Sequence, residues 1–178
     1  MLTEPEHFAG SNDDLRNVRG AVGLPVLKKD FHVEPIQLLE AKGLGASAAL
    51  LIVRALGPLG LSQMMTAAQA LAIETLVEIR DERELEMALE AGARVIGINN
   101  RNLETLEIDP ATGERLLKRI PAEIIAIGES GVSGRADVER MARAGADAIL
   151  VGSSVSSASD PAEAVRGLTG VSRVARGD

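Results

Sequence analysis

Short apolar runs alternate with longer amphipathic stretches along the chain. Three of the runs begin near residues 48, 95 and 148, and each follows a Leu-Gly-Ala or Ala-Gly-Ala triplet. A glycine in this position is suited to ending a helix, and the apolar run that follows a short turn is typical of a strand. Strands with little polar alternation are buried on both faces, which indicates a parallel sheet covered by helices.

Three further strands lack this triplet, and prolines and acidic caps mark the helices between the strands. Pro110 and Pro161 each follow an aspartate, and Asp81 with Glu84 has the spacing of a capping box. Pro35 begins another helix, and residues 134–143 form one more, with Val138 and Met141 facing inward. The additional strands are predicted at Pro25–Lys29, Thr75–Ile79 and Glu123–Gly128.

The six strands recur about every 25 residues between residues 25 and 148. Such a βα repeat closes as a (β/α)8 barrel or opens as a doubly wound sheet. A complete barrel needs roughly 200–250 residues, and residues 1–23 show a loop and a helix without a strand. We therefore predict an α/β fold in one domain over residues 1–178: a TIM barrel of the phosphate-binding type that lacks its first two strands. The open sheet edges would need a homo-oligomer or a complementing N-terminal segment.

Composition excludes several classes of function. The 178 residues carry 26 acidic and 19 basic side chains, a net charge of −7, so the basic field that nucleic acid requires is absent. The chain has no cysteine, which excludes thiolate metal sites, and His7 and His32 are too isolated to suggest any other metal site. An apolar run such as Ala48–Val53 is too short to cross a membrane. Without a visible secretory signal, we expect a cytoplasmic protein.

Polar residues terminate almost every predicted strand, at the edge where parallel α/β proteins hold their chemistry. Lys29, Glu78, Asn99 and Glu129 lie inside or beside apolar runs. A lone buried charge is costly, so these groups are expected to offset one another around a polar ligand. Strand alternation lets only one of Lys28 and Lys29 point inward. A solvated lysine pair and a structural ion pair between a lysine and Glu78 remain alternatives.

The last two strands end in small residues. Glu129-Ser130-Gly131 follows one, and Gly152-Ser153-Ser154 follows the next. In barrels of this kind, the loops after the last two strands commonly bind phosphate, and glycine lets the backbone approach an anion closely. Simple turns are the alternative for either cluster alone, but the pair favours a phosphate site.

These segments together resemble the indole-3-glycerol phosphate synthase family of tryptophan biosynthesis, over essentially the whole chain. The resemblance is carried by residues 2–11, 24–31, 76–79, 129–132 and 151–154, and most specifically by Lys29-Asp30-Phe31 and Gly97-Ile98-Asn99-Asn100-Arg101. It implies a carboxy-lyase without a cofactor. The implied reaction closes the indole ring of 1-(2-carboxyphenylamino)-1-deoxyribulose 5-phosphate with loss of carbon dioxide and water.

The resemblance also implies roles for individual residues. Lys29 is the expected general acid, Glu78 a carboxylate beside it, and Asn99 the residue that orients the substrate and assists dehydration. The expected substrate contacts are Phe8 and Phe31 against the aromatic ring, Arg101 in support of the loops, Glu129 as a second carboxylate, and Ser130, Gly131, Gly152 and Ser153 around the phosphate.

Two other functions stay open. The family's first strand carries a Glu-x-Lys pair that has no counterpart in this chain, so one alternative is an inactive domain that still binds a phosphorylated ligand. The other is a different phosphate-binding barrel enzyme, such as a sugar-phosphate isomerase. Lys29-Asp30-Phe31 and Gly97-Ile98-Asn99 favour the synthase over the isomerase.

Overall fold

A computed structural model describes residues 1–102 and 105–176 of the chain. The chain divides into two compact units. Unit 1 comprises residues 1–78 and 86–93, and unit 2 comprises residues 79–85 and 94–178. The last residue of strand β3 and the first half of helix α5 (Glu82–Glu90) therefore belong to unit 2.

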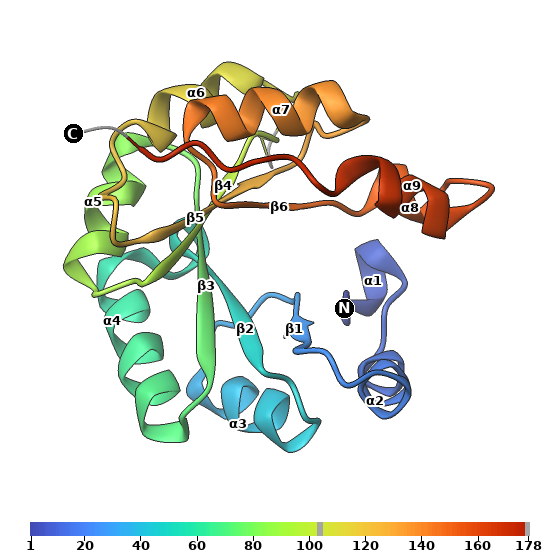
Figure 1. Ribbon diagram of the computed structural model, residues 1–178. Helices are drawn as coiled ribbons and strands as arrows, with labels where there is room; N and C mark the ends of the chain where they lie inside the picture. Colours follow the sequence, from blue (N-terminus) through green and yellow to red (C-terminus); the bar gives the residue numbers. More distant parts are fainter. Residues whose placement is uncertain (103–104, 177–178) are drawn as a thin grey trace. The chain divides into compact units, whose positions relative to one another are not determined.

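Unit 1 is built on parallel strands covered by helices. Its strands are β1 (Leu27–Lys28), β2 (Ala48–Ile52) and β3 (Glu74–Ile79), where β1 pairs with β2 and β2 with β3. Its helices are α1 (Pro5–Phe8), α2 (Asn12–Ala21), α3 (Pro35–Gly43) and α4 (Val53–Leu71). Helices α3 and α4 pack on each other and against β2 (Figure 1). Their buried Leu38 and Leu61 meet the core around Leu50 and Val77.

Strand β1 is shorter than the predicted run from Pro25 to Lys29. The backbone N–H of Val26 is bonded to the Ser47 hydroxyl rather than to a strand partner. Lys29 forms an isolated parallel bridge with Leu2, in which its N–H donates to the Met1 carbonyl and its carbonyl accepts from Thr3. Residues 1–3 therefore cover part of the outer side of β1, which is the edge strand of the sheet.

Unit 2 repeats the same design. Its strands are β4 (Val95–Asn99), β5 (Ile125–Glu129) and β6 (Ala148–Leu150), and both neighbouring pairs are parallel. The register places Asn99 opposite Glu129 at the carboxyl ends of β4 and β5. Helix α6 packs on β4 and helix α7 on β6. The helices are α6 (Pro110–Leu117), α7 (Arg135–Ala144), α8 (Ser153–Ser156) and α9 (Pro161–Leu168).

The predicted helix starts are confirmed. Pro35, Pro110 and Pro161 occupy first turns, and the Asp109 and Asp160 side chains accept backbone N–H groups there. The Asp81 carboxylate likewise accepts from the N–H of Glu84 at 2.8 Å. Helix α7 begins one residue later than predicted, because Gly134 is its extended N-cap. Among the described residues, no helix has both the length and the apolar character needed to cross a membrane.

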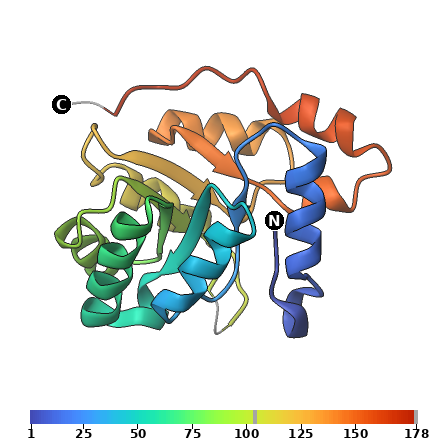
Figure 2. The ribbon, with the colours of Figure 1, turned by 90° about the horizontal axis from the view of Figure 1, so that it is seen from below.

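A buried arginine helps to hold the C-terminal segment of unit 2. Figures 1 and 2 both show the chain after α9 running back alongside α7. Near its end, Arg176 is almost fully buried and donates to Asp147 Oδ2 at 2.8 Å, to the Gly145 carbonyl at 2.7 Å and to the Ile124 carbonyl. Asp147 also accepts from Arg173 at 2.8 Å, but the Arg173 side chain is 65% exposed.

Arg176→Ala is therefore expected to lower the free energy of unfolding by about 2–3 kcal/mol, because buried carbonyls and a carboxylate lose a charged donor. Arg173→Ala removes an exposed partner of the same carboxylate and is expected to cost under about 1 kcal/mol. Urea unfolding of the two variants measures the difference. Equal losses of unfolding free energy in the two variants would show that the burial of Arg176 does not make its contacts more stabilising than those of Arg173.

Candidate active site

Lys29 and Glu78 form an ion pair in unit 1. Lys29 Nζ donates to Glu78 Oε2 at 3.1 Å. Glu78 lies in β3 with its side chain only 4% exposed, whereas the Lys29 side chain is 27% exposed. The pair thus joins a buried carboxylate to an ammonium group that solvent still reaches. An ammonium of this kind can give a proton to a bound ligand.

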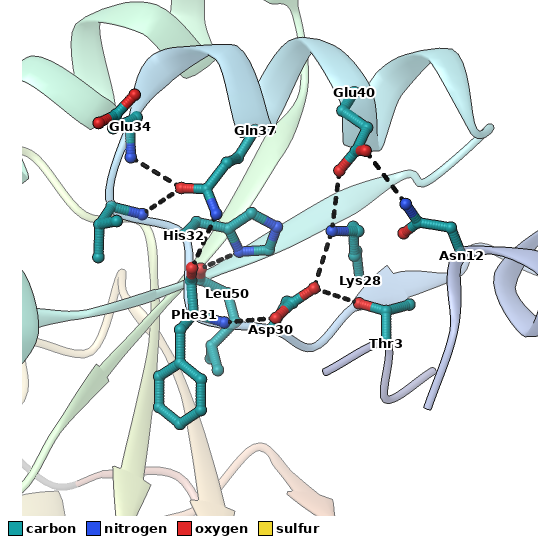
Figure 3. Close-up of polar contacts among 11 residues, drawn as sticks. Thr3, Asn12, Lys28, Asp30, Phe31, His32, Glu34, Gln37, Glu40 and Leu50 are labelled. Carbon is teal, nitrogen blue, oxygen red and sulfur yellow. Dashed lines mark hydrogen bonds and ion pairs between the residues drawn. The ribbon is translucent and has the colours of Figure 1, made fainter. Parts of the chain in front are cut away.

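Lys28 forms ion pairs with two other carboxylates (Figure 3). Its side chain is 2% exposed, and Nζ donates to Asp30 Oδ2 at 2.9 Å and to Glu40 Oε2 of α3 at 3.4 Å. Asn12 of α2 donates to the other oxygen of Glu40 at 3.1 Å. Because neighbouring residues of an extended segment point to opposite sides, Lys28 takes the buried side and leaves Lys29 for Glu78. The predicted division between the two lysines is confirmed.

Asp30 completes this cluster. It accepts from the Thr3 hydroxyl at 2.6 Å and from the N–H of Phe31 at 2.9 Å, in addition to Lys28. Burial disfavours the charged carboxylate, but the hydrogen bonds from Thr3, Lys28 and Phe31 outweigh it and lower the pKa of Asp30. Lys28 and Asp30 therefore form a charged bridge across the backbone of Lys29, on the side away from Glu78.

In unit 2, the carboxyl ends of β4 and β5 bring several of the predicted residues together. Asn99 Oδ1 accepts from the Ser130 hydroxyl at 2.8 Å and from the N–H of Arg101 at 3.0 Å. Glu129, opposite Asn99 in the register, is 1% exposed. The side chain of Arg101 reaches along its own loop and donates to the Leu106 carbonyl at 3.3 Å.

The two glycine-serine loops are linked within unit 2. Ser154 Oγ donates to the Val132 carbonyl at 2.9 Å, which ties the turn after β6 to the loop after β5. Ser130 and Gly131 both have left-handed backbones, with φ values of 63° and 78°. A Cβ on Gly131 would lie 2.8 Å from Ile108 Cγ2, and its left-handed backbone favours glycine, so a larger residue there would be strained. Gly152 and Ser153 are exposed and accessible to a ligand.

The two phenylalanines belong to unit 1, and both are partly exposed. Phe8, at the end of α1, is 52% exposed, and Phe31 is 43% exposed. Large apolar side chains at this exposure are available to an aromatic ligand. Of the predicted residues, unit 1 thus contributes Phe8, Lys29, Phe31 and Glu78, and unit 2 contributes Asn99, Arg101, Glu129, Ser130, Gly131, Gly152 and Ser153.

Some of the polar groups that the structure brings together were not predicted from the sequence. Asn100 is completely buried, yet only its neighbour Asn99 was singled out. Glu4, Glu6 and His7 place ligand atoms within 4.8 Å of one another, although His7 looked isolated. The Glu4 carboxylate already accepts the N–H groups of residues 6, 7 and 8 as the cap of α1, which accounts for this grouping. The sequence signal for this grouping is the presence of Glu4, Glu6 and His7 within one helical turn.

His32 is the second histidine and is 2% exposed, with Nδ1 2.8 Å from the Leu50 carbonyl. Burial lowers its pKa, and nearby Lys28 adds to this effect, although Leu50, Asp30 and Glu40 oppose it. Because the native state takes up a proton at this site less readily than the unfolded state, stability falls as the pH drops below the unfolded value of about 6.5.

His32→Asn keeps a donor for Leu50 but cannot titrate, so its free energy of unfolding is expected to fall less between pH 7.5 and pH 5 than that of the unaltered protein. His7→Asn, at an exposed position, is the matched control and is expected to keep the full fall. The lowered pKa of Asp30 contributes stability that is lost only as the pH falls below about 4, outside this window. Urea titrations at both pH values measure the slope, and the same slope in both variants would contradict the assignment.

Known proteins that are similar in sequence to this chain belong to one family. The family model of indole-3-glycerol phosphate synthase matches residues 1–168. An indole-3-glycerol phosphate synthase of Kineococcus radiotolerans is 49% identical over 168 residues, covering 94% of this chain and 61% of the relative. Indole-3-glycerol phosphate synthase 2 of Streptomyces coelicolor is 46% identical over 170 residues, covering 96% of this chain and 66% of the relative. The chain thus spans less than two thirds of the length of these relatives.

Solved structures share the fold at low identity. The crystal structure of 3-hexulose-6-phosphate synthase from Salmonella typhimurium matches with a TM-score of 0.78 and 16% identity, covering 94% of this chain and 83% of that one. At this identity the likeness shows the fold alone, and it confirms the predicted α/β class related to TIM barrels. With the family model and curated relatives at nearly half identity, the chain belongs to the indole-3-glycerol phosphate synthase family.

Proposed function

We propose that the protein acts as an indole-3-glycerol phosphate synthase on 1-(2-carboxyphenylamino)-1-deoxyribulose 5-phosphate. The aromatic carbon that bears the carboxylate attacks the ketone carbon, and carbon dioxide and then water leave to give the indole. The observation that carries the proposal is the Lys29–Glu78 pair at 3.1 Å, in which the ammonium is partly exposed beside a buried carboxylate.

Lys29 supplies the first proton. Negative charge develops on the ketone oxygen as the new carbon–carbon bond forms, and a nearby ammonium both stabilises that charge and protonates the oxygen. Glu78 holds the ammonium in place through its hydrogen bond. The hydroxyl produced in this step is the group that later leaves as water, and Asn99 and Glu129 of unit 2 are proposed to assist that dehydration. The residues carry out these steps without a cofactor.

The remaining contacts bind the two ends of the substrate. The backbone N–H groups of Ser130, Gly131, Gly152 and Ser153, with the Ser153 hydroxyl, are proposed to hold the phosphate, since the two loops that carry them are linked through Ser154 and Val132. Phe8 and Phe31 are proposed to line the aromatic ring, and Arg101 supports the loop after β4. The cytoplasmic location and the homo-oligomer or complementing segment stay predictions.

The absence of tryptophan and tyrosine makes the test direct. An indole product emits in the near ultraviolet, where this chain contributes no tryptophan or tyrosine emission, so its fluorescence reports turnover when it is read at a wavelength that separates it from the anthranilate-type substrate. The assay is run on the chain alone and on a fusion that supplies the part of the Kineococcus radiotolerans relative that this chain does not match. Indole emission from either protein supports the proposal. If neither forms indole while the relative itself does, the synthase function is refuted, and binding of a phosphorylated ligand without turnover replaces it.

A further inference from the structure

We propose that Asn100 is a positioning residue: it holds the backbone of Ser130, and Ser130 in turn fixes the amide of Asn99 so that Asn99 meets the substrate as an N–H donor. The inference deepens the proposed function, in which Asn99 orients the substrate. It uses contacts within unit 2 alone.

The orientation of the Asn99 amide follows from its partners. A backbone N–H can only donate, so the atom of Asn99 that lies 3.0 Å from the N–H of Arg101 is the oxygen Oδ1. The Ser130 hydroxyl donates to the same Oδ1 at 2.8 Å. Two donors occupy the two lone pairs of this oxygen. Any contact that the Asn99 amide makes with a substrate is therefore expected to come from Nδ2, which suits a substrate oxygen and not an N–H group.

The hydroxyl that fixes Asn99 depends on an uncommon backbone. Ser130 has φ of 63°, a left-handed conformation that residues other than glycine seldom adopt. Such a residue keeps this conformation only where its surroundings hold it. Here the Ser130 carbonyl accepts from Nδ2 of Asn100 at 3.1 Å, and the following Gly131 is confined by Ile108.

Asn100 is suited to this task because every polar group it carries is bonded. It is fully buried; its Oδ1 accepts from the N–H of Gly113 in α6 at 2.9 Å, while Nδ2 donates to Ser130. Its own N–H donates to the Glu129 carbonyl at 3.1 Å, and its carbonyl accepts from Asp109 at 2.9 Å. Since Gly113 only donates and the Ser130 carbonyl only accepts, the position requires both an acceptor and a donor. A carboxylate would satisfy Gly113 and repel the Ser130 carbonyl.

The hydrogen bonds that run from Asn100 through Ser130 to Asn99 are called the relay. The side-chain amide NMR signals of the full chain test this relay without any substrate. The sequence has five asparagines and three glutamines, so a ¹⁵N-labelled sample gives eight amide pairs. Asn100→Asp and Ser130→Ala are expected to shift the Asn99 pair in the same direction, and the double variant no further than either alone. Asn12→Asp makes the same chemical change in α2 and is expected to leave the Asn99 pair in place. An unshifted Asn99 pair in Asn100→Asp overturns the proposal.

Gly113→Ala gives a second route should Asn100→Asp fold poorly. The new Cβ would lie 2.8 Å from Asn100 Oδ1, so the amide of Asn100 must move while α6 keeps a good helix former. The same displacement of the Asn99 signals is expected, and its absence counts against the relay.

Kinetics separate this inference from the proposed function. In a protein that forms indole, Asn100→Asp is expected to lower kcat about 10²-fold and also to raise KM, because Ser130 is a proposed phosphate contact as well. Adding it to Asn99→Ala should cause no further loss of kcat, because both act on kcat through one amide. Independent, multiplying losses would overturn the relay. If the unaltered protein forms no indole, the proposed function fails, and the amide spectra still decide the position of Asn99.

Discussion

Lys29→Met is expected to abolish most of the indole formation, by about 10²–10⁴-fold, in a protein that otherwise forms indole. Methionine keeps the length of the side chain but cannot donate a proton or stabilise a developing negative charge. Affinity for a phosphorylated product analogue should change little, since the proposed phosphate contacts lie on Ser130, Gly131, Gly152 and Ser153. Fluorescence of the product measures kcat, and fluorescence titration with indole-3-glycerol phosphate measures binding.

Lys42→Met is the matched control for this experiment. Lys42 is an exposed lysine near the end of α3 whose ammonium donates to the Leu71 carbonyl, so its replacement should leave turnover unchanged. Turnover by Lys29→Met at the rate of the control would refute the general-acid role. A loss of product affinity as large as the loss of turnover would instead make Lys29 a binding residue.

Asp30→Ala is expected to lower the free energy of unfolding by about 3 kcal/mol or more at pH 7. It leaves the ammonium of the 2% exposed Lys28 with only the half-exposed Glu40, and it deprives the Thr3 hydroxyl of its partner. Breaking a buried pair from one side is costly because an uncompensated charge remains. Since the pKa of Asp30 is lowered in the native state, its contribution is present above about pH 4 and is lost as the pH falls further.

Two further variants identify the cause of this loss. Lys28→Met combined with Asp30→Ala removes both charges and should recover much of the stability, because an apolar replacement of a buried pair is often close to neutral. Asp13→Ala breaks the exposed pair with Arg16 and should cost under about 1 kcal/mol. Urea unfolding gives all three values. A double variant as unstable as Asp30→Ala would show that packing, not the unpaired charge, is responsible.

Most of the fold follows from local signals in the sequence. Strands β2 to β5 match the predicted runs within about two residues because their apolar stretches are continuous and bounded by turns. The helix starts follow from Pro110 and Pro161 after their capping aspartates. Strand β1 was predicted too long, because the N–H of Val26 is bonded to the Ser47 side chain and Lys29 pairs with Leu2 only in an isolated bridge.

The site was only partly predictable for the same reason. Strand alternation correctly predicted that Lys28 and Lys29 point to opposite sides. The acceptors of Lys28 are Asp30 and Glu40 of α3, and no spacing rule predicts that these side chains come together. The sequence shows two adjacent asparagines without showing that Asn100 is buried among backbone partners. His32 binds a backbone carbonyl, which leaves no signal in the residue pattern. Whether Lys29 and Asn99 act on the same substrate is part of the proposal and has its own test.

A titration of the isotope-labelled chain with indole-3-glycerol phosphate shows whether Lys29 and Asn99 respond to the same ligand. The signals of Lys29, which is one of four lysines, and of Glu78 report from unit 1, while those of Asn99 and the N–H of Gly152 report from unit 2. We expect the signals of Lys29, Asn99 and Gly152 to move along one saturation curve with a single Kd. Movement confined to one unit, or different Kd values for the two, would contradict this expectation.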